Sequence, residues 1–119
     1  MAVERLFGPV DISVSGMRAH DKSMEVISSN IANARTIDAG QGQPYRRLQP
    51  ILRSENEGVS GVTVEDVVPD MSALQRIYDP GNPQADAQGY IVMPNVHLPV
   101  EMMSLNVASR AYQANAAIL

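Results

Sequence analysis

The residues that could carry chemistry are few and widely separated. Catalysis requires a nucleophile with a base, a pair of carboxylates, or a metal site. The chain has no cysteine, which excludes thiol catalysis, disulfides and Cys-based metal sites. Its two histidines, His20 and His97, are far apart and neither has a partner at ligand spacing. We interpret His20 as a helix-packing residue and His97 as a loop residue.

Oxygen-bearing side chains gather in the segment DPGNPQADAQGY, and calcium is the ligand to consider there. An EF-hand loop needs oxygen ligands at alternate positions, a central Gly and a later Glu. Here prolines interrupt the pattern and no Glu follows at the required distance. The sequence therefore predicts a proline-stiffened turn. The side chains concerned are Asp79, Asn82, Asp86 and Gln88.

The serines and glycines form no catalytic or phosphate-binding motif. The sequences around Ser15 and Ser60 do not form a G-x-S-x-G nucleophile elbow, and there is no phosphate-binding glycine motif. We predict that the chain is not an enzyme and that it has no catalytic residue, no cofactor and no metal.

Composition and net charge further limit the classes of protein to which the chain could belong. The 119 residues suggest one domain, and with one Phe and no Trp its core must rest on Val, Ile, Leu and Met. The net charge of −4 argues against nucleic acid, because phosphate binding needs concentrated positive charge. The only basic cluster, Arg46, Arg47 and Arg53, is interpreted as a solvated or ion-paired face.

Apolar and small residues recur at helical spacing near the beginning of the chain. Steps of three and four predict a helix over residues 10–34 with a seam close to a heptad pattern. Pro9 and Asp11 fit its start. The seam positions are Val10, Ser13, Met17, His20, Met24, Ile27, Ile31 and Ala34.

A second seam predicts a helix over residues 98–119, with Pro99 in its first turn. Its positions are Leu98, Met102, Leu105, Ser109, Tyr112, Ala116 and Leu119. Two seamed helices at the ends of a chain are expected to pair. We predict that Met17, Met24, Ile27 and Ile31 pack against Met102, Leu105, Tyr112 and Leu119.

The middle of the chain reads as short extended segments. Strands are expected within YRRLQPILR, GVTVEDVV, ALQRIYD and YIVMPNV, with Pro50 confining the first to an edge or a bulge. The predicted fold class is α+β. An antiparallel coiled-coil-like hairpin combines residues 1–36 and 98–119, and a small β-rich domain over residues 37–97 is inserted between them.

The two helices lack a charged face. Residues 26–34 carry no charge, and residues 102–119 carry only Arg110. Such a helix is expected to have protein on several sides, which in a small chain means other chains. We predict that Asn30, Asn33, Arg110 and Asn115 face neighbouring subunits. The alternative from pattern alone is an ordinary antiparallel helical hairpin whose outer surface faces solvent and carries few charges.

No targeting segment is expected. Glu4 and Arg5 come early and no long apolar run follows, so we predict no cleavable secretory signal. No segment is long and apolar enough to span a bilayer. The chain is expected in the cytosol unless it leaves by a route that needs no cleaved signal.

Four stretches together resemble the bacterial flagellar axial proteins, and among them the proximal-rod proteins. The run SNIANART matches the N-terminal helix motif of that family, and SRAYQAN matches its C-terminal helix motif. The stretches PYRRLQPIL and YDPGNPQADAQGYIVMPNV are typical of the proximal-rod members. Each motif is moderately specific, and the four in this order, covering nearly the whole chain, are strongly specific.

The resemblance implies a structural role. Rod proteins of this family leave the cytoplasm unprocessed through the flagellar type III export apparatus. They assemble in the periplasm, with copies of themselves and other rod proteins, into a helical tube that transmits torque and conducts exported subunits. The terminal helices form its inner coiled-coil layer. From the net charge and the lack of a long apolar segment we expect no nucleic acid partner and no direct membrane insertion.

One feature departs from the family pattern. Its members usually continue with more helix after the Y-Q-A-N motif, whereas this sequence stops at Leu119. Either the sequence is truncated or this member is short.

The rival function is a soluble adaptor, similar to an export chaperone, that covers a partner's amphipathic helix.

Overall fold

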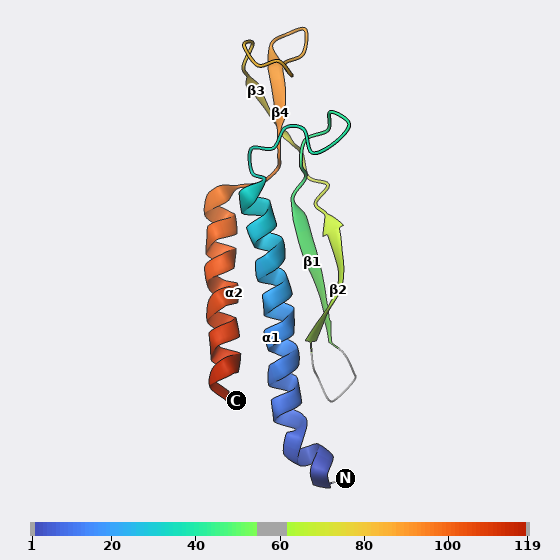
Figure 1. Ribbon diagram of the computed structural model, residues 1–119, viewed down its shortest axis with the longest axis vertical. Coiled ribbons are helices and arrows are strands. Elements are labelled where there is room, and N and C mark those ends of the chain that lie inside the picture. Colours follow the sequence, from blue (N-terminus) through green and yellow to red (C-terminus); the bar gives the residue numbers. More distant parts are fainter. Residues whose placement is uncertain (1, 55–61, 119) are drawn as a thin grey trace.

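The computed structural model describes residues 2–54 and 62–118 and has an α+β fold (Figure 1). Helix α1 (Ala2–Ala32) comes first in the sequence and helix α2 (Leu98–Ile118) comes last, with four strands between them. The strands are β1 (Leu48–Ser54), β2 (Val62–Pro69), β3 (Gln75–Tyr78) and β4 (Tyr90–Met93).

The two helices lie side by side and run in opposite directions (Figure 1). Helix α1 begins at Ala2, so the predicted start near Val10 is wrong. Pro9 does not begin the helix but lies inside it. A proline in a helix removes one backbone hydrogen bond and commonly causes a bend, and the N-terminal end of α1 bends away from the helix axis (Figure 1).

The helix ends adjoining the strands have identifiable causes. Helix α1 ends at Ala32 because the Asn33 side chain closes its last turn. The amide nitrogen of Asn33 donates to the Ser29 carbonyl over 2.9 Å, and its oxygen accepts from the Thr36 hydroxyl. Helix α2 begins at Leu98, where Pro99 in the first turn has no N–H to leave unpaired.

The strands form two separate two-stranded antiparallel sheets. In the first, Leu48 of β1 lies opposite Pro69 of β2, and the register shifts between Ile51 and Leu52, next to Pro50. This sheet lies along α1 (Figure 1). In the second, Gln75 of β3 lies opposite Met93 of β4, and the sheet projects beyond the end of the helix pair (Figure 1).

The chain is elongated and has a small interior. Its extents are 69 × 24 × 18 Å and its radius of gyration is 19.1 Å, whereas a compact domain of this length has a radius of about 13.5 Å. The accessible surface of 8111 Å² exceeds the roughly 6,300 Å² expected for a monomer of this mass. Much of the apolar surface therefore remains uncovered in a single copy.

The interior is unusually polar. Among the described residues the buried apolar side chains are small or medium-sized, while five polar residues are also buried. The most enclosed large side chains are Glu101, Asn30 and Pro94. The buried apolar residues are Ala19, Val26, Ile27, Ile91, Val96 and Ala108.

The predicted helix-pairing seam is only partly enclosed. Ile27 is buried, whereas Met17, Met24, Ile31, Leu105 and Tyr112 are half-buried. Met102 is 54% exposed, which contradicts its assignment to the seam. The innermost positions of α2 are Glu101 and Ala108, and Met102 is rotated about 100° from Glu101. Leu119 lies outside the described residues.

Candidate assembly interface

A cluster of six polar residues joins the helices to the strands, and we call it the polar joint. It lies where α1 ends, β1 begins and α2 begins. The sequence elements that meet there are far apart along the chain. The residues of the polar joint are Asn30, Tyr45, Arg47, Asp70, Asn95 and Glu101.

Asn30 fixes the first residue of β1 to α1. Its side chain has no exposed surface. The amide nitrogen donates to the Leu48 carbonyl over 2.8 Å, and the amide oxygen accepts from the Leu48 N–H over 2.9 Å. The oxygen also accepts from the Tyr45 hydroxyl over 2.6 Å, and the nitrogen also donates to Glu101 over 3.4 Å. The full hydrogen-bonding capacity of the amide is thus used within one chain.

Arg47 connects β1 with α2 and with the turn after β2. Its Nε donates to Glu101 Oε1, and one terminal nitrogen donates to Asp70 Oδ2 over 3.1 Å. Glu101 is only 1% exposed. Burial alone would lower the pKa of Arg47, but the hydrogen bonds and charges of Glu101 and Asp70 raise it above its ordinary value. The guanidinium therefore stays charged and compensates the buried carboxylate.

Asp70 is held by its own turn as well as by Arg47. The Ser72 backbone N–H donates to Asp70 Oδ1 over 2.8 Å. This bond is the main cause that lowers the pKa of Asp70, followed by the Ser72 hydroxyl and by Arg47. Asp70 therefore remains a carboxylate that can pair with Arg47.

Asn95 closes the joint from the segment before α2. Its oxygen accepts from the Arg47 backbone N–H over 2.7 Å, and its nitrogen donates to the Asp70 carbonyl over 2.9 Å. It is buried. Among the described residues, every buried side-chain nitrogen or oxygen has a hydrogen-bond partner. The joint is fully satisfied, which is the condition under which buried polar groups are tolerated.

The three asparagines predicted to face neighbours make contacts within the chain; Asn30 is fully buried, whereas Asn33 and Asn115 are half-buried. Asn30 belongs to the polar joint, and Asn33 closes the last turn of α1. Asn115 lies against Gly16 of α1 and donates to the Ala111 carbonyl over 3.2 Å. Amides suit buried positions because they can satisfy backbone groups there. Asn30 has no surface left for a neighbour, so its prediction is corrected to a role within the chain, whereas those for Asn33 and Asn115 stay predictions.

Arg110 is the remaining predicted residue, and it is exposed on α2. Across the described residues it has no hydrogen-bond or ion-pair partner. Its assignment to a contact with a neighbour stays a prediction.

Sequence reasoning missed an apolar stripe along the outside of α2. Val100, Met103 and Val107 are 55%, 69% and 66% exposed. They continue at heptad spacing through Arg110 and Ala114 to Ala117, which are exposed too. We call this row the outer stripe of α2. The same three-four spacing that indicated the first seam could have revealed this second one.

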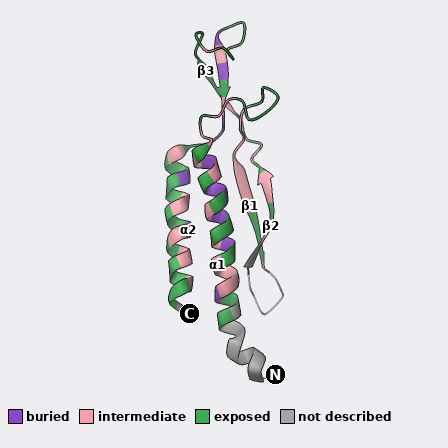
Figure 2. Cartoon of the chain, viewed as in Figure 1, coloured by how far each residue is buried: buried purple, intermediate pink, exposed green. Residues whose placement is uncertain are grey.

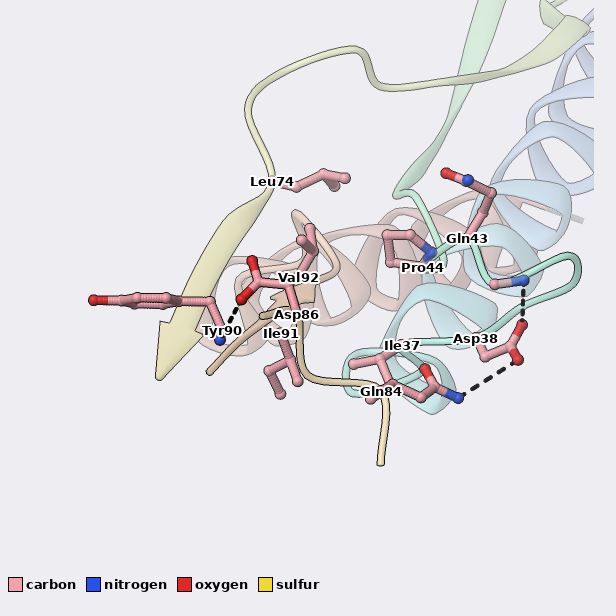
Figure 3. A pocket seen from close by; sticks show the side chains of 11 residues that line it. Ile37, Asp38, Gln43, Pro44, Leu74, Gln84, Asp86, Tyr90, Ile91 and Val92 are labelled. Carbon is pink, nitrogen blue, oxygen red and sulfur yellow. Dashed lines mark hydrogen bonds between the residues drawn. The ribbon is translucent and has the colours of Figure 1, made fainter. Parts of the chain in front are cut away.

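A cleft of about 610 Å³ lies between the loop after α1 and the β3–β4 sheet (Figure 3). Its two carboxylates serve the turns around it. Asp38 accepts from the Gly42 N–H and from Gln84, and Asp86 accepts from the Tyr90 N–H over 2.9 Å. The Tyr90 N–H, then the Gln88 N–H and Arg76, lower the pKa of Asp86. The cleft has no nucleophile with a base.

The loop examined for calcium forms hydrogen-bonded turns. Asn82 accepts from the Gln84 N–H over 2.9 Å and donates to Asp79 over 3.3 Å. Over residues 2–54 and 62–118, no group of three or more His, Cys, Asp or Glu side chains could hold a metal ion. His97 lies in the loop before α2, where its carbonyl accepts from the Glu101 N–H, and His20 is half-buried on α1.

Within the same described part of the chain, neither helix has a stretch that is both long enough and apolar enough to cross a bilayer. The chain thus combines a polar joint in its interior with an apolar stripe on its outside. Such a surface serves association with other protein chains.

Comparison with known families identifies the class. Residues 11–36 match the family described as flagella basal body rod protein. Residues 87–119 match the family described as flagellar basal body rod FlgEFG protein C-terminal. The matched segments contain most of α1 and all of α2, so the paired helices carry the signature of flagellar basal-body rod proteins.

Curated relatives narrow the identification. The flagellar basal-body rod protein FlgC of Salmonella typhimurium is 39% identical, over 100% of this chain and 89% of the relative. Those of Aquifex aeolicus and Borreliella burgdorferi are 35% and 34% identical, over 92% and 96% of this chain and 84% and 88% of the relatives. The chain belongs to the FlgC family of flagellar basal-body rod proteins.

Proposed function

We propose that this chain is a structural subunit of the flagellar basal-body rod and acts through helix packing with its neighbours. The observation that carries the proposal is the outer stripe of α2, which leaves Val100, Met103 and Val107 in solvent in a single copy. Figure 2 shows exposed positions along the length of α2. Large apolar side chains in a continuous row are a feature of protein contact surfaces.

The shape of the molecule supports the same role. A chain whose surface exceeds that of a compact monomer by roughly 1,800 Å² is suited to an assembly that covers the excess. An interface of standard size buries about 1,600 Å² in total. The helix pair would thus be completed by neighbouring subunits.

We also propose that the terminal and middle parts of the chain occupy different layers of the rod. Residues 1–36 and 98–119 would form an antiparallel coiled-coil-like hairpin in the inner layer of the rod. Residues 37–97 would form its outer part. The polar joint lies between the two and would hold their relative orientation, because its ion pairs and amides link both helices to β1.

Membership of the FlgC family supports a proposal for how the subunit is exported and where it assembles. The subunit would leave the cytoplasm through the flagellar export apparatus without a cleaved signal. It would join other rod proteins in the periplasm, in the proximal part of a tube that transmits torque and conducts exported subunits. A structural subunit in such a tube needs no cofactor and no reaction.

The proposal is tested by deletion and complementation in the source bacterium. Loss of the gene should abolish motility and rod assembly. The wild-type gene should restore both, and the protein should be found in isolated basal bodies. Unchanged motility after deletion, or absence of the protein from basal bodies, would contradict the proposal.

A soluble helix-binding adaptor is the alternative function. An adaptor should remain in the cytoplasm, and an excess of partner helix should saturate it. Fractionation of cells separates the two, since a rod subunit is recovered with the basal body and an adaptor with the cytoplasm.

A further inference from the structure

A shallow groove lies on the helix pair, apart from the outer stripe of α2. It is a hollow of about 260 Å³ formed by Val14, Met17, Arg18 and Asp21 of α1 together with Tyr112 of α2. Val14, Met17 and Tyr112 are half-buried, so each still presents apolar surface to the solvent. Arg18 and Asp21 at its rim are exposed. The groove is therefore open to another chain.

The groove and the outer stripe face different directions. Val107 of the stripe and Tyr112 of the groove are five positions apart on α2. At about 100° per residue they point roughly 140° apart. A single copy cannot bring these two surfaces together, whereas two copies can.

We propose that the outer stripe of one copy packs into the groove of the next copy, with Val107 or Met103 entering the hollow against Met17 and Tyr112. This inference rests on the proposed function and specifies the contact between subunits. A hollow of this size accommodates one or two apolar side chains. Exposed apolar side chains on one surface and a half-buried apolar lining on the other are complementary.

The charges at the two surfaces are complementary as well. Arg110 is the only charge of the stripe, and the groove is lined by Arg18 and by Asp21, of which Asp21 has the opposite sign to Arg110. Arg110 and Asp21 are both exposed, and neither has an ion-pair or hydrogen-bond partner in the part of the chain that the structure describes. Val107 and Arg110 are separated by about one turn, as are Met17 and Asp21. An Arg110–Asp21 pair would fix the register of the contact.

The symmetry of this contact follows from the different surfaces involved. A contact between unlike surfaces is heterologous, and it repeats from copy to copy until it closes a ring or forms an open helix. Packing stripe against stripe would instead close at two copies. It would also leave the groove and Asp21 uncovered. The heterologous contact covers the stripe, the groove and Asp21 together.

Cysteine cross-linking tests the contact, because the chain has no cysteine and each introduced thiol is the only one. Met17→Cys and Val107→Cys would be placed in two differently tagged copies expressed in the same cells. Basal bodies would then be isolated and treated with a short bismaleimide. We expect a cross-linked dimer that contains both tags. Val14→Cys with Ala114→Cys provides a second pair in case the first impairs assembly.

The controls separate this contact from others. Met102→Cys replaces Val107→Cys as the matched control, since Met102 is also exposed on α2 but lies five positions away. It should give no dimer with Met17→Cys. A dimer formed by Val107→Cys alone would demonstrate stripe-to-stripe packing and overturn the inference. Basal bodies that contain both variants of each pair without cross-linking would overturn it too.

The charge pair gives an independent test with the same readout. Asp21→Arg should lower the yield of the mixed dimer at least about fivefold, because it places like charges together. Adding Arg110→Asp should restore the yield. Absence of the protein from basal bodies would instead refute the proposed function, so the two failures can be distinguished.

Discussion

Gly16 of α1 and Asn115 of α2 meet so closely that a Cβ on Gly16 would lie 2.9 Å from the Asn115 amide nitrogen. This distance is shorter than ordinary contact, so a side chain at position 16 forces Asn115 to move. Glycine in the middle of a helix costs about 1 kcal/mol relative to alanine. The close contact between the helices explains why glycine is nevertheless suitable there.

Gly16→Ala is expected to destabilise the chain by about 1 kcal/mol, because the displaced Asn115 loses its packing. In an Asn115→Ala background the same change should be neutral or stabilising by up to about 1 kcal/mol, through helix propensity. Urea denaturation of the four variants measures this coupling. Gly81→Ala is the control, since a Cβ there meets no atom within 4 Å. Equal effects of Gly16→Ala in both backgrounds would contradict the contact.

Because the Glu101 carboxylate is buried, its replacement by glutamine is expected to lower the stability of the fold substantially. Both of its oxygens accept hydrogen bonds, from Arg47 and from Asn30. Glutamine has one oxygen, so Glu101→Gln places an NH₂ group against a donor and removes the charge that pairs with Arg47. We expect a loss of about 2–3 kcal/mol in the free energy of unfolding, below the full cost of breaking a buried pair because Arg47 is partly exposed.

Glu25→Gln is the matched control for this prediction. Glu25 lies on α1, is exposed, and pairs with Lys22 over 3.5 Å. Exposed pairs of this kind contribute little, so its effect should remain within about 0.5 kcal/mol. Equal stabilities of the two variants would show that the polar joint does not hold the fold together.

The lowered pKa of Asp70 predicts that the stability of the fold depends on pH in the acidic range. Its folded-state pKa is lowered below the ordinary 3.8, first by the Ser72 N–H and then by the Ser72 hydroxyl and Arg47. A lowered pKa means that the unfolded state binds the proton first as the pH falls. The stability from Asp70 is therefore complete above 3.8 and is lost as the pH falls through its folded-state pKa.

Comparison with Asp70→Asn tests this dependence. The variant should be less stable than the wild type at about pH 7, and the two should converge as the pH falls through the lowered folded-state pKa of Asp70. Asp21→Asn is the control, since Asp21 has no partner in the described part of the chain. Denaturation at a series of pH values measures the difference. A constant difference between wild type and Asp70→Asn would refute the assignment.

The outer stripe of α2 predicts a defect in assembly without a defect in folding. Val107→Glu places a charge on a surface that we propose is buried in the rod, where an unpaired charge is strongly unfavourable. Motility should be lost while the circular dichroism spectrum and the export of the protein are unchanged. Gln113→Glu, exposed elsewhere on α2, should swim normally. Full motility of Val107→Glu would exclude the stripe from the contact.

The helices could be predicted from the sequence because they depend on local spacing. The three-four pattern indicated both helices, and Leu98 was the predicted start of α2. The start of α1 was predicted too late, since Pro9 resembles a helix entry but lies within the helix. A single proline does not end a helix whose neighbouring turns remain bonded.

The polar joint could not be predicted because its residues are brought together only by folding. Arg47 and Glu101 are 54 positions apart in the sequence, and no local motif relates them. Arg47 was assigned to a solvated or ion-paired face, and it is ion-paired. The asparagines in α1 suggested buried polar contacts, but Asn30 makes those contacts with β1 and α2 of its own chain.

A structure of the isolated basal body tests the central claim most directly. The account predicts that α1 and α2 of this chain lie in the rod, with Val100, Met103 and Val107 covered by neighbouring subunits. It would be contradicted if the chain were absent from the rod, or if the outer stripe of α2 remained exposed to solvent in the assembled structure.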